Sequence, residues 1–178
     1  MSSLAEFRDQ YEPLIVAACE WRAMHTDPDP LADRVFSLLA TQSGEPGLRA
    51  AYRALEKVVF DSYLEASATV SIMSRLKGEQ RPVPNAPADT AEEKKLRDGV
   101  AKLRRRDRDL LQRAYWDELS ENELAEVEGA DVRTVIDRRE QALNNYRKVV
   151  ARLLPGTDAG LASKLFRSVK PGIRTRWE

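Results

Sequence analysis

The sequence is poor in the residues that build disulfides, metal sites and catalytic centres. Its 178 residues include one cysteine, Cys19, and one histidine, His25. A single cysteine cannot form an internal disulfide, and these two residues do not suggest a thiol–imidazole nucleophile, so we expect Cys19 to be buried and structural. Acidic residues stand among arginines on helix faces, without a glycine-rich loop or a metal-spaced ligand set. We therefore predict that the chain is not an enzyme and has no catalytic residue, metal or cofactor.

Long hydrophobic runs are also missing. No apolar stretch approaches the roughly 18 residues that a membrane span requires. Residues 1–8 lack the basic stretch and apolar segment of a secretory signal. A hydrophobic content of 42% with 33% charged residues is typical of a soluble helical protein. The sequence therefore predicts a cytoplasmic protein without a membrane partner.

The chain has no net charge, since 29 Lys and Arg balance 29 Asp and Glu. This balance at first argues against nucleic-acid binding, which depends on cationic side chains. The charges are unevenly distributed, however. Residues 1–80 hold 8 basic and 12 acidic residues, whereas residues 133–178 hold 11 basic and 4 acidic ones. The asymmetry favours a protein-facing first half and a DNA-facing second half, although two ordinary solvated surfaces would give the same counts.

The first part of the chain has the apolar spacing of three amphipathic helices. The first is predicted over residues 4–24. The second begins with Asp29 as N-cap and Pro30 as the first helical residue, and it ends at the Gly and Pro residues of 43–47. The third covers residues 48–76, which contain neither Pro nor Gly. Together they predict one small helical domain over residues 1–77.

Three prolines and a lack of periodicity predict a flexible linker over residues 78–90. A second helical domain is predicted over 91–155, with helices that begin at the capping residues Thr90, Asp107, Ser120 and Asp131. The basic extension at 156–178 would form either a short amphipathic helix or a disordered segment. The predicted fold is all-α, with two small helical domains joined by a Pro-rich linker.

Residues 120–146 have the pattern of a helix-turn-helix. A capped short helix is followed by Gly129, which suits a turn that needs a positive φ, and then by a second helix capped by Asp131. Val132 and Val135 of the second helix are expected to pack against Leu124 and Val127 of the first. The side chains left on the outer face of the second helix are Arg133, Thr134, Asp137, Arg138 and Gln141.

These five residue types can read DNA. Arginine pairs with guanine, glutamine with adenine and aspartate with cytosine, while threonine contacts a phosphate or a thymine methyl group. We therefore predict that the second helix enters the major groove and that these residues contact DNA. Helical hairpins with a glycine turn also occur as plain packing units, so the pattern alone leaves that alternative open.

The second half of the chain contains a set of short motifs: LRRRDRDLL at 103–111, YWDELS at 115–120, ELAEV at 123–127, Gly129, and the segment 134–138. This set resembles region 4 of the bacterial sigma-70 family, and more narrowly of its extracytoplasmic-function (ECF) class. The resemblance implies that this domain reads the promoter −35 element and packs on the flap of the RNA polymerase β subunit. Two positions depart from the family: Glu128 replaces a usual leucine, and Arg139 replaces a buried apolar residue.

The first half is similar in layout to region 2 of the same family. Residues 29–36 stand where that family engages the β′ clamp helices, so the resemblance implies that Asp33, Arg34 and Phe36 bind polymerase. The helix over 48–76 would face the −10 element. It has no clear counterpart of the family's tryptophan and basic residues. It also carries Glu56, Asp61 and Glu65, which do not suit a surface that must approach phosphates.

The resemblance implies a sigma factor that binds core RNA polymerase and directs it to specific promoter DNA. It also leaves room for an anti-sigma partner. Two other functions stay open. A sigma-like interaction protein would bind polymerase or a regulator without melting DNA, and a stand-alone helix-turn-helix regulator would bind operators as a dimer.

Overall fold

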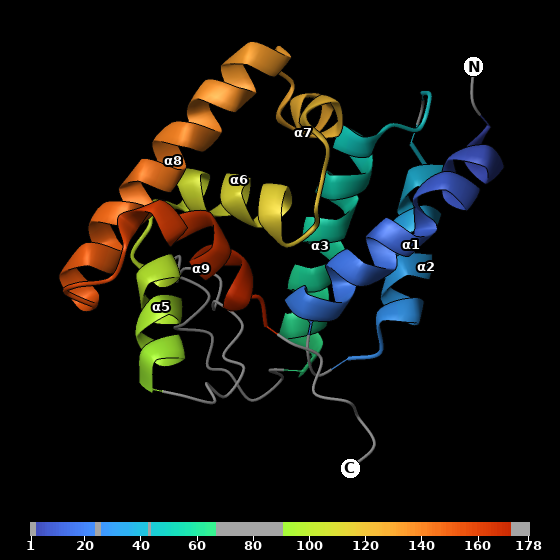
Figure 1. Cartoon of the computed structure of the whole chain (residues 1–178). Coiled ribbons are helices and arrows are strands. Elements are labelled where there is room, and N and C mark those ends of the chain that lie inside the picture. Colours follow the sequence, from blue (N-terminus) through green and yellow to red (C-terminus); the bar gives the residue numbers. More distant parts are fainter. Residues whose placement is uncertain (1–2, 24–25, 43, 67–90, 172–178) are drawn as a thin grey trace. The chain divides into compact units, whose positions relative to one another are not determined.

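The computed structural model describes residues 3–23, 26–42, 44–66 and 91–171, and within these ranges the chain is helical without any strand (Figure 1). The predicted all-α class is thus confirmed for the described residues. The helices form two compact units, one containing α1 to α3 and the other α5 to α9. The predicted linker lies outside the described residues. None of the described helices is long and apolar enough to span a membrane.

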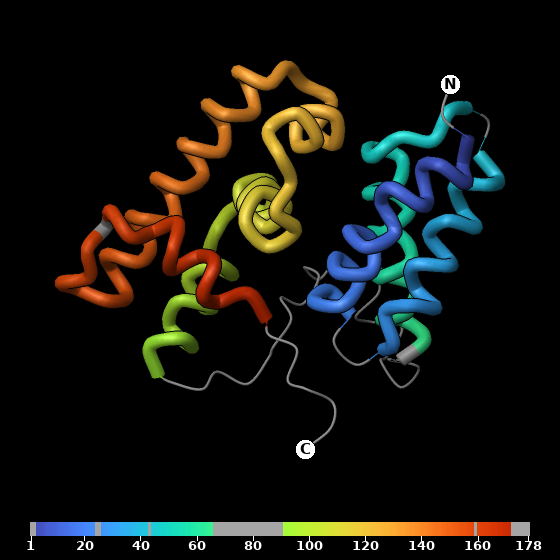
Figure 2. Tube along the Cα trace, turned by 45° about the vertical axis from the view of Figure 1, so that its right-hand side comes forward, coloured from blue at the N-terminus to red at the C-terminus, as the bar shows by residue number. Residues whose placement is uncertain are grey.

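Unit 1 is a bundle of three helices that all pack on one another (Figure 2). They are α1 (Leu4–Arg22), α2 (Pro28–Ala40) and α3 (Leu48–Ala66). Helix α1 begins at a capping box, in which the Ser3 hydroxyl accepts from the Glu6 amide and the Glu6 carboxylate accepts from the Ser3 amide. The predicted extension of the third helix to residue 76 lies outside the described residues.

The core of unit 1 comes from the apolar stripe of each helix. Cys19 is buried among these residues, as expected from the sequence. Burial of such side chains is the main favourable term in the folding of a small bundle. The largest fully buried side chains of this unit are Tyr52, Ile15, Leu31, Leu48, Leu55, Val35 and Val58.

Helix α2 begins two residues earlier than predicted. Its N-cap is Asp27, whose carboxylate accepts from the Asp29 amide at 3.3 Å, and Pro28 is its first residue. The prediction of Asp29 as N-cap and Pro30 as first residue was therefore wrong. The first turn of a helix has no internal acceptors for its N–H groups, so two prolines there cost no hydrogen bond.

Unit 2 is built around α8, its longest helix, against which α5, α6, α7 and α9 all pack. Helices α7 and α8 form the helix-turn-helix. The elements of this unit are α5 (Ala91–Ala101), α6 (Arg105–Tyr115), α7 (Glu121–Glu128), α8 (Val132–Leu153), the short 3₁₀ helix η1 (Ala159–Leu161) and α9 (Ala162–Ser168).

Helix α6 also begins earlier than predicted. Arg104 is its N-cap and forms no side-chain cap bond within the described chain. Asp107, predicted as the cap, lies in the first turn and accepts instead from the Asn145 amide nitrogen at 2.8 Å. Helix α6 thus follows directly after a tight turn at the end of α5, in which the Leu103 amide donates to the Val100 carbonyl at 3.2 Å and the Leu103 side chain is buried.

The segment predicted as a C-terminal extension contributes to the core of unit 2. The Phe166 ring of α9 is fully buried and lies 5.2 Å from the Trp116 ring, 5.1 Å from Tyr146 and 6.0 Å from Tyr115, centroid to centroid. The Trp116 indole donates to the Phe166 carbonyl at 2.8 Å, and the Lys170 ammonium donates to the Trp116 carbonyl at 2.6 Å. Of the two possibilities left open for this segment, the structure has a short helix over Ala162–Ser168, while residues 172–178 lie outside the described residues.

Candidate nucleic-acid interface

The turn between α7 and α8 has the geometry that the sequence predicted. Ser120 and Glu123 form the expected capping box at the start of α7. Gly129 ends α7 in the left-handed conformation, with φ 63° and ψ 43°, and its amide donates to the Glu126 carbonyl at 3.1 Å. A side chain at this position would be strained, which explains the choice of glycine.

Asp131 is the N-cap of α8, as predicted. Its carboxylate accepts from the Thr134 amide at 2.8 Å and from the Thr134 hydroxyl at 2.6 Å. These hydrogen bonds hold the pKa of Asp131 below its usual value, and the bond from the Thr134 hydroxyl has the largest effect. The hydroxyl hydrogen of Thr134 is therefore committed to the cap, so Thr134 has less to offer DNA than its sequence position suggested.

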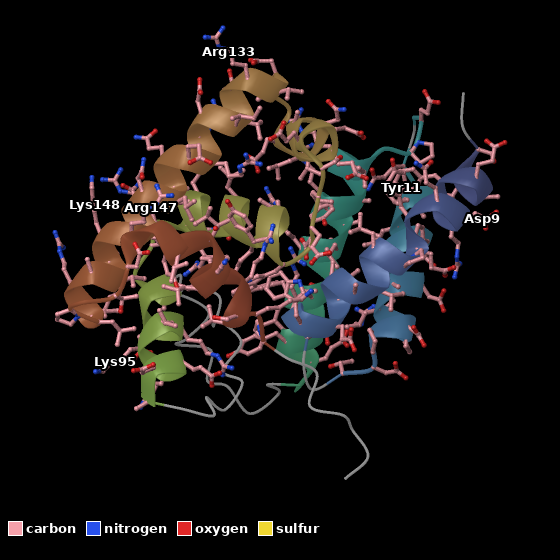
Figure 3. The ribbon with its side chains drawn as sticks, viewed as in Figure 1. Asp9, Tyr11, Lys95, Arg133, Arg147 and Lys148 are labelled. Atoms are coloured by element: carbon pink, nitrogen blue, oxygen red, sulfur yellow. The ribbon has the colours of Figure 1, made fainter. Side chains whose placement is uncertain are left out.

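The predicted recognition residues share the outer side of the first half of α8. Arg133, Asp137 and Gln141 are exposed, and Thr134 and Arg138 are half-buried. Arg133 projects from the N-terminal end of α8, away from the rest of the unit (Figure 3).

The opposite side of α8 packs against α7. Val135 is 1% exposed and Leu124 of α7 is fully buried. The predicted docking of the two helices is therefore confirmed at these positions, whereas Val132 is only half-buried. Because α8 is anchored along one side, its recognition residues are held on a rigid element.

A groove of about 330 Å³ adjoins this recognition face. It lies between the turn that joins α5 to α6 and the middle of α8, and Gln141 belongs to both the groove and the recognition face. Two cations, Lys102 and Arg104, and one carboxylate, Asp107, line it. The sequence had not singled out Lys102, because its place beside α8 follows only from packing. The lining residues are Lys102, Leu103, Arg104, Asp107, Gln141, Asn145 and Val149.

Glu128 and Arg139, the two residues that the sequence marks as unusual for the sigma-70 pattern, both form ion pairs. Glu128, at the end of α7, accepts from the Arg113 guanidinium of α6 at 2.5 Å, and the two side chains are 13% and 15% exposed. Arg139 of α8 pairs with Glu121 of α7 at 3.2 Å. Both residues thus take part in charged contacts of α7.

The three predicted polymerase-binding residues lie on α2 and all have partners inside unit 1. The Asp33 carboxylate accepts from the Arg8 guanidinium at 2.6 Å. Arg8 also donates to the Glu12 carboxylate. Both hydrogen bonds raise the pKa of Arg8, and the one to Glu12 has the larger effect. Phe36 is 3% exposed and lies under the Arg8 guanidinium, 5.1 Å from its ring centroid. Asp33 therefore offers surface to a partner, while Phe36 belongs to the core.

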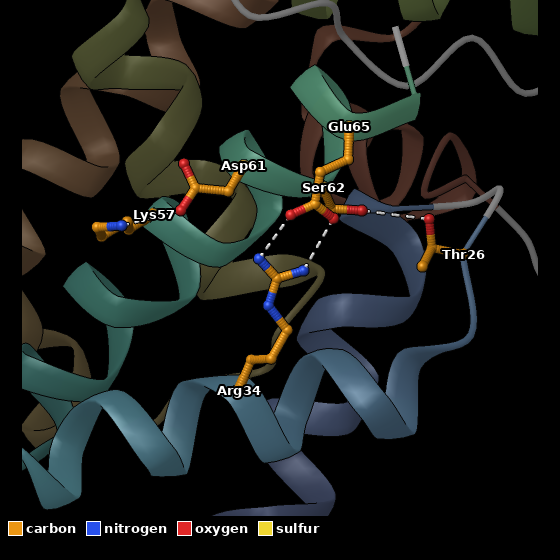
Figure 4. A network of polar contacts seen from close by, with 6 residues as sticks. All are labelled: Thr26, Arg34, Lys57, Asp61, Ser62 and Glu65. Carbon is orange, nitrogen blue, oxygen red and sulfur yellow. Dashed lines mark hydrogen bonds and ion pairs between the residues drawn. The ribbon is translucent and has the colours of Figure 1, made fainter. Parts of the chain in front are cut away.

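Arg34, the third of these residues, makes a two-pronged contact with Glu65 of α3, at 3.1 and 3.0 Å (Figure 4). One turn earlier on α3, Lys57 pairs with Asp61 at 2.9 Å. Two of the acidic side chains that seemed unsuited to a DNA-facing helix are thus neutralised by neighbours.

Helix α3 also presents a feature that the sequence reasoning missed. Phe60 and Tyr63 are 43% and 45% exposed. Arg49 and Arg53 are exposed as well, and their spacing places them on the same side of α3. This surface could have been predicted by asking which aromatic residues of α3 share a side with its arginines, as well as which belong to the apolar stripe.

Within the described residues, no group of His, Cys, Asp or Glu side chains is arranged to hold a metal ion. Comparison with known proteins adds no assignment: no family model matches the sequence, and neither a curated protein nor a solved structure matches the chain.

Proposed function

We propose that this chain is a promoter-recognising transcription initiation factor of the sigma-70 type, and that unit 2 binds duplex DNA through α7 and α8. The observation that carries the proposal is the arrangement of these helices. Gly129 and Asp131 set a tight turn, and the exposed side of α8 then presents Arg133, Asp137 and Gln141. A helix presented in this way fits the width of a major groove.

The groove beside α8 supports the same orientation. With α8 in the major groove, Lys102 and Arg104 would lie close to the phosphates of one strand, where cations contribute affinity without sequence preference. Arg133 and Arg138 would read guanine edges, and Gln141 would read adenine.

For unit 1 we propose contact with core RNA polymerase and with the −10 element. This part of the proposal rests on the sequence resemblance to region 2. The paired state of Asp61 and Glu65 supports it, because their charges are offset before DNA approaches. Because Phe36 is buried, the proposed polymerase contact would be made by Asp33, Arg34 and their exposed neighbours.

The DNA-binding part is tested by selecting duplexes from a random pool with the full chain and then measuring affinity for the selected duplex. Arg133→Ala and Arg138→Ala are each expected to cost about 1–3 kcal/mol of binding and to relax the base preference. Lys164→Met, at an exposed position of α9, is the matched control for the loss of one positive charge. Two arginine variants that bind and select like the parent would show that the recognition face is misassigned.

The transcription part is tested with core RNA polymerase in a reconstituted reaction on a genomic library, followed by start-site mapping. A sigma factor is expected to co-purify with core polymerase and to start transcripts at defined sites. Polymerase binding that inhibits open-complex formation would instead identify a sigma-like interaction protein. Operator binding by a stable dimer, without polymerase, would identify a stand-alone regulator.

A further inference from the structure

We propose that Arg113 of α6 is a positioning residue for DNA recognition: its ion pair with Glu128 sets the end of α7 and thereby the direction in which α8 leaves the turn. The consequence for DNA rests on the function proposed above. The consequence for the turn itself does not. Arg113 lies on α6, outside the recognition face, and would act only through α7.

The side chains of this pair are only 15% and 13% exposed, so both charges are largely withdrawn from water. An ionised carboxylate in such a place is stable only if a partner offsets its loss of water. Arg113 supplies that partner. Without the guanidinium, the Glu128 carboxylate would need water in its place, and we expect the last turn of α7 to move toward solvent to provide it.

The location of Glu128 makes this dependence stronger. It is the last residue of α7, where unpaired carbonyl groups give the helix end a partial negative charge. A carboxylate is unfavourable there, and a cation is favourable. The Arg113 guanidinium offsets both the side-chain charge and the charge of the helix end.

Little chain separates this helix end from the recognition helix. Only residues 129–131 join α7 to α8. The amides of Gly129 and Ala130 bond back to the carbonyls of Glu126 and Ala125, each at 3.1 Å. A movement of the α7 end is therefore passed directly to the start of α8.

The start of α8 is the part of the helix that would follow such a movement. Arg133 is its second residue and projects from its N-terminal end (Figure 3), so a shift of about 2 Å there would displace this side chain by a similar distance. A hydrogen bond to a base edge does not survive such a shift. Positioning by Arg113 therefore reaches the DNA-reading side chains without touching them.

The other end of α7 has a weaker pair. Arg139 and Glu121 are 22% and 48% exposed and 3.2 Å apart. Exposed pairs contribute little to stability, because water screens them and both side chains lose freedom. Glu121→Gln is therefore a matched comparison in which one ion pair of the same helix is broken with little expected effect.

The experiment uses the full chain and the duplex that the parent selects from a random pool. Arg113→Met is expected to weaken binding by about tenfold, the loss of one well-aligned base contact, and to reduce discrimination against mismatched duplexes. It is also expected to speed hydrogen exchange at the amides of residues 125–135. Arg113→Met combined with Glu128→Leu replaces the ion pair by an apolar contact and is expected to restore both properties. Glu121→Gln and the charge control Lys164→Met are expected to behave like the parent.

An Arg113→Met variant that matches Lys164→Met in affinity, discrimination and exchange would overturn the proposal. So would a variant that is merely less stable but binds and discriminates normally once folded. If Arg113→Met does not fold, Glu128→Gln replaces it, and unchanged exchange at residues 125–135 then counts against positioning. If the parent selects no duplex, the proposed function fails, while the exchange comparison still decides the role of Arg113.

Discussion

The two units place their charged side chains differently. In unit 1 the ion pairs lie at the surface: the Arg8–Asp33 side chains are 42% and 62% exposed, and the Arg34–Glu65 side chains 42% and 64%. In unit 2 charged and polar side chains enter the interior, where Arg108 and Asp117 are 7% exposed and Gln112 is 8% exposed. Unit 1 is therefore held mainly by apolar stripes, and unit 2 also by polar contacts.

This difference follows from the helices themselves. Unit 1 has three helices of 13 to 19 residues, each with one apolar side. In unit 2, α7 has 8 residues and α9 has 7, which is too short to bury much apolar surface. Such helices need caps, ion pairs and aromatic anchors. The comparison predicts that unit 2 is more sensitive than unit 1 to the loss of a single polar or aromatic side chain.

The largest effect is expected at the aromatic contact of α9. Phe166→Ala removes a fully buried ring that touches Tyr115, Trp116 and Tyr146. It should lower the free energy of unfolding by about 3–5 kcal/mol in chemical denaturation. Phe60→Ala in unit 1 is the control, because that ring is 43% exposed and its loss should change little. Equal effects would mean that α9 does not anchor unit 2.

The next prediction compares the stability lost when one ion pair is broken in each unit. Arg113→Met leaves the Glu128 carboxylate without its partner in a nearly buried place and should destabilise unit 2 by about 3 kcal/mol. Arg34→Met breaks the exposed pair with Glu65 and should cost less than about 1 kcal/mol. Thermal unfolding of the two variants measures both values. A larger loss for Arg34→Met would reverse the comparison.

A stabilising change is expected in the core of unit 2. The Tyr146 side chain is fully buried, burial raises its pKa, and its hydroxyl has no hydrogen-bond partner among the described residues. Tyr146→Phe removes this unsatisfied group and should raise the free energy of unfolding by about 1 kcal/mol. Tyr63→Phe, at an exposed position in unit 1, should leave it unchanged. A loss of stability in Tyr146→Phe would indicate that the hydroxyl has a partner.

The smallest effect concerns acid. The N-cap of α8 is an aspartate, whereas that of α1 is a serine. The pKa of Asp131 is lowered in the folded chain, so its cap contributes fully above the usual aspartate value of 3.8 and is lost as the pH falls below it. The Thr134 amide should therefore become less protected in acid. Asp131→Asn keeps an acceptor and removes this titration. If acid lowers the protection of the Thr134 amide equally in the parent and in Asp131→Asn, titration of Asp131 is not the cause.

Local signals predicted the helix-turn-helix accurately. The capping box at Ser120, the glycine at position 129 and the cap at Asp131 each occur as expected. They depend on residues within three or four positions of one another, so tertiary packing has little chance to override them. The same local rules were ambiguous at 27–30, where two successive Asp-Pro pairs offered two starts for α2.

Contacts between distant residues could not be predicted in this way. Arg113 and Glu128 are 15 positions apart, and Trp116 and Phe166 are 50 apart. A sequence pattern shows that Glu128 and Arg139 are unusual at their positions, but it does not show which side chain lies opposite each. The groove beside α8 could not be predicted from the sequence for the same reason, because its walls come from two separate segments.

The sequence by itself determined the all-helical class, the turn before α8 and the residues that stand on its outer side, because helical period and capping are local properties of the chain. Only the tertiary structure decided that the segment after Pro155 contributes to the core of unit 2, that Phe36 lies inside unit 1, and that an arginine of α6 holds the end of α7. Those facts depend on which helices meet. That is settled by the shapes and charges of entire faces rather than by neighbours along the chain.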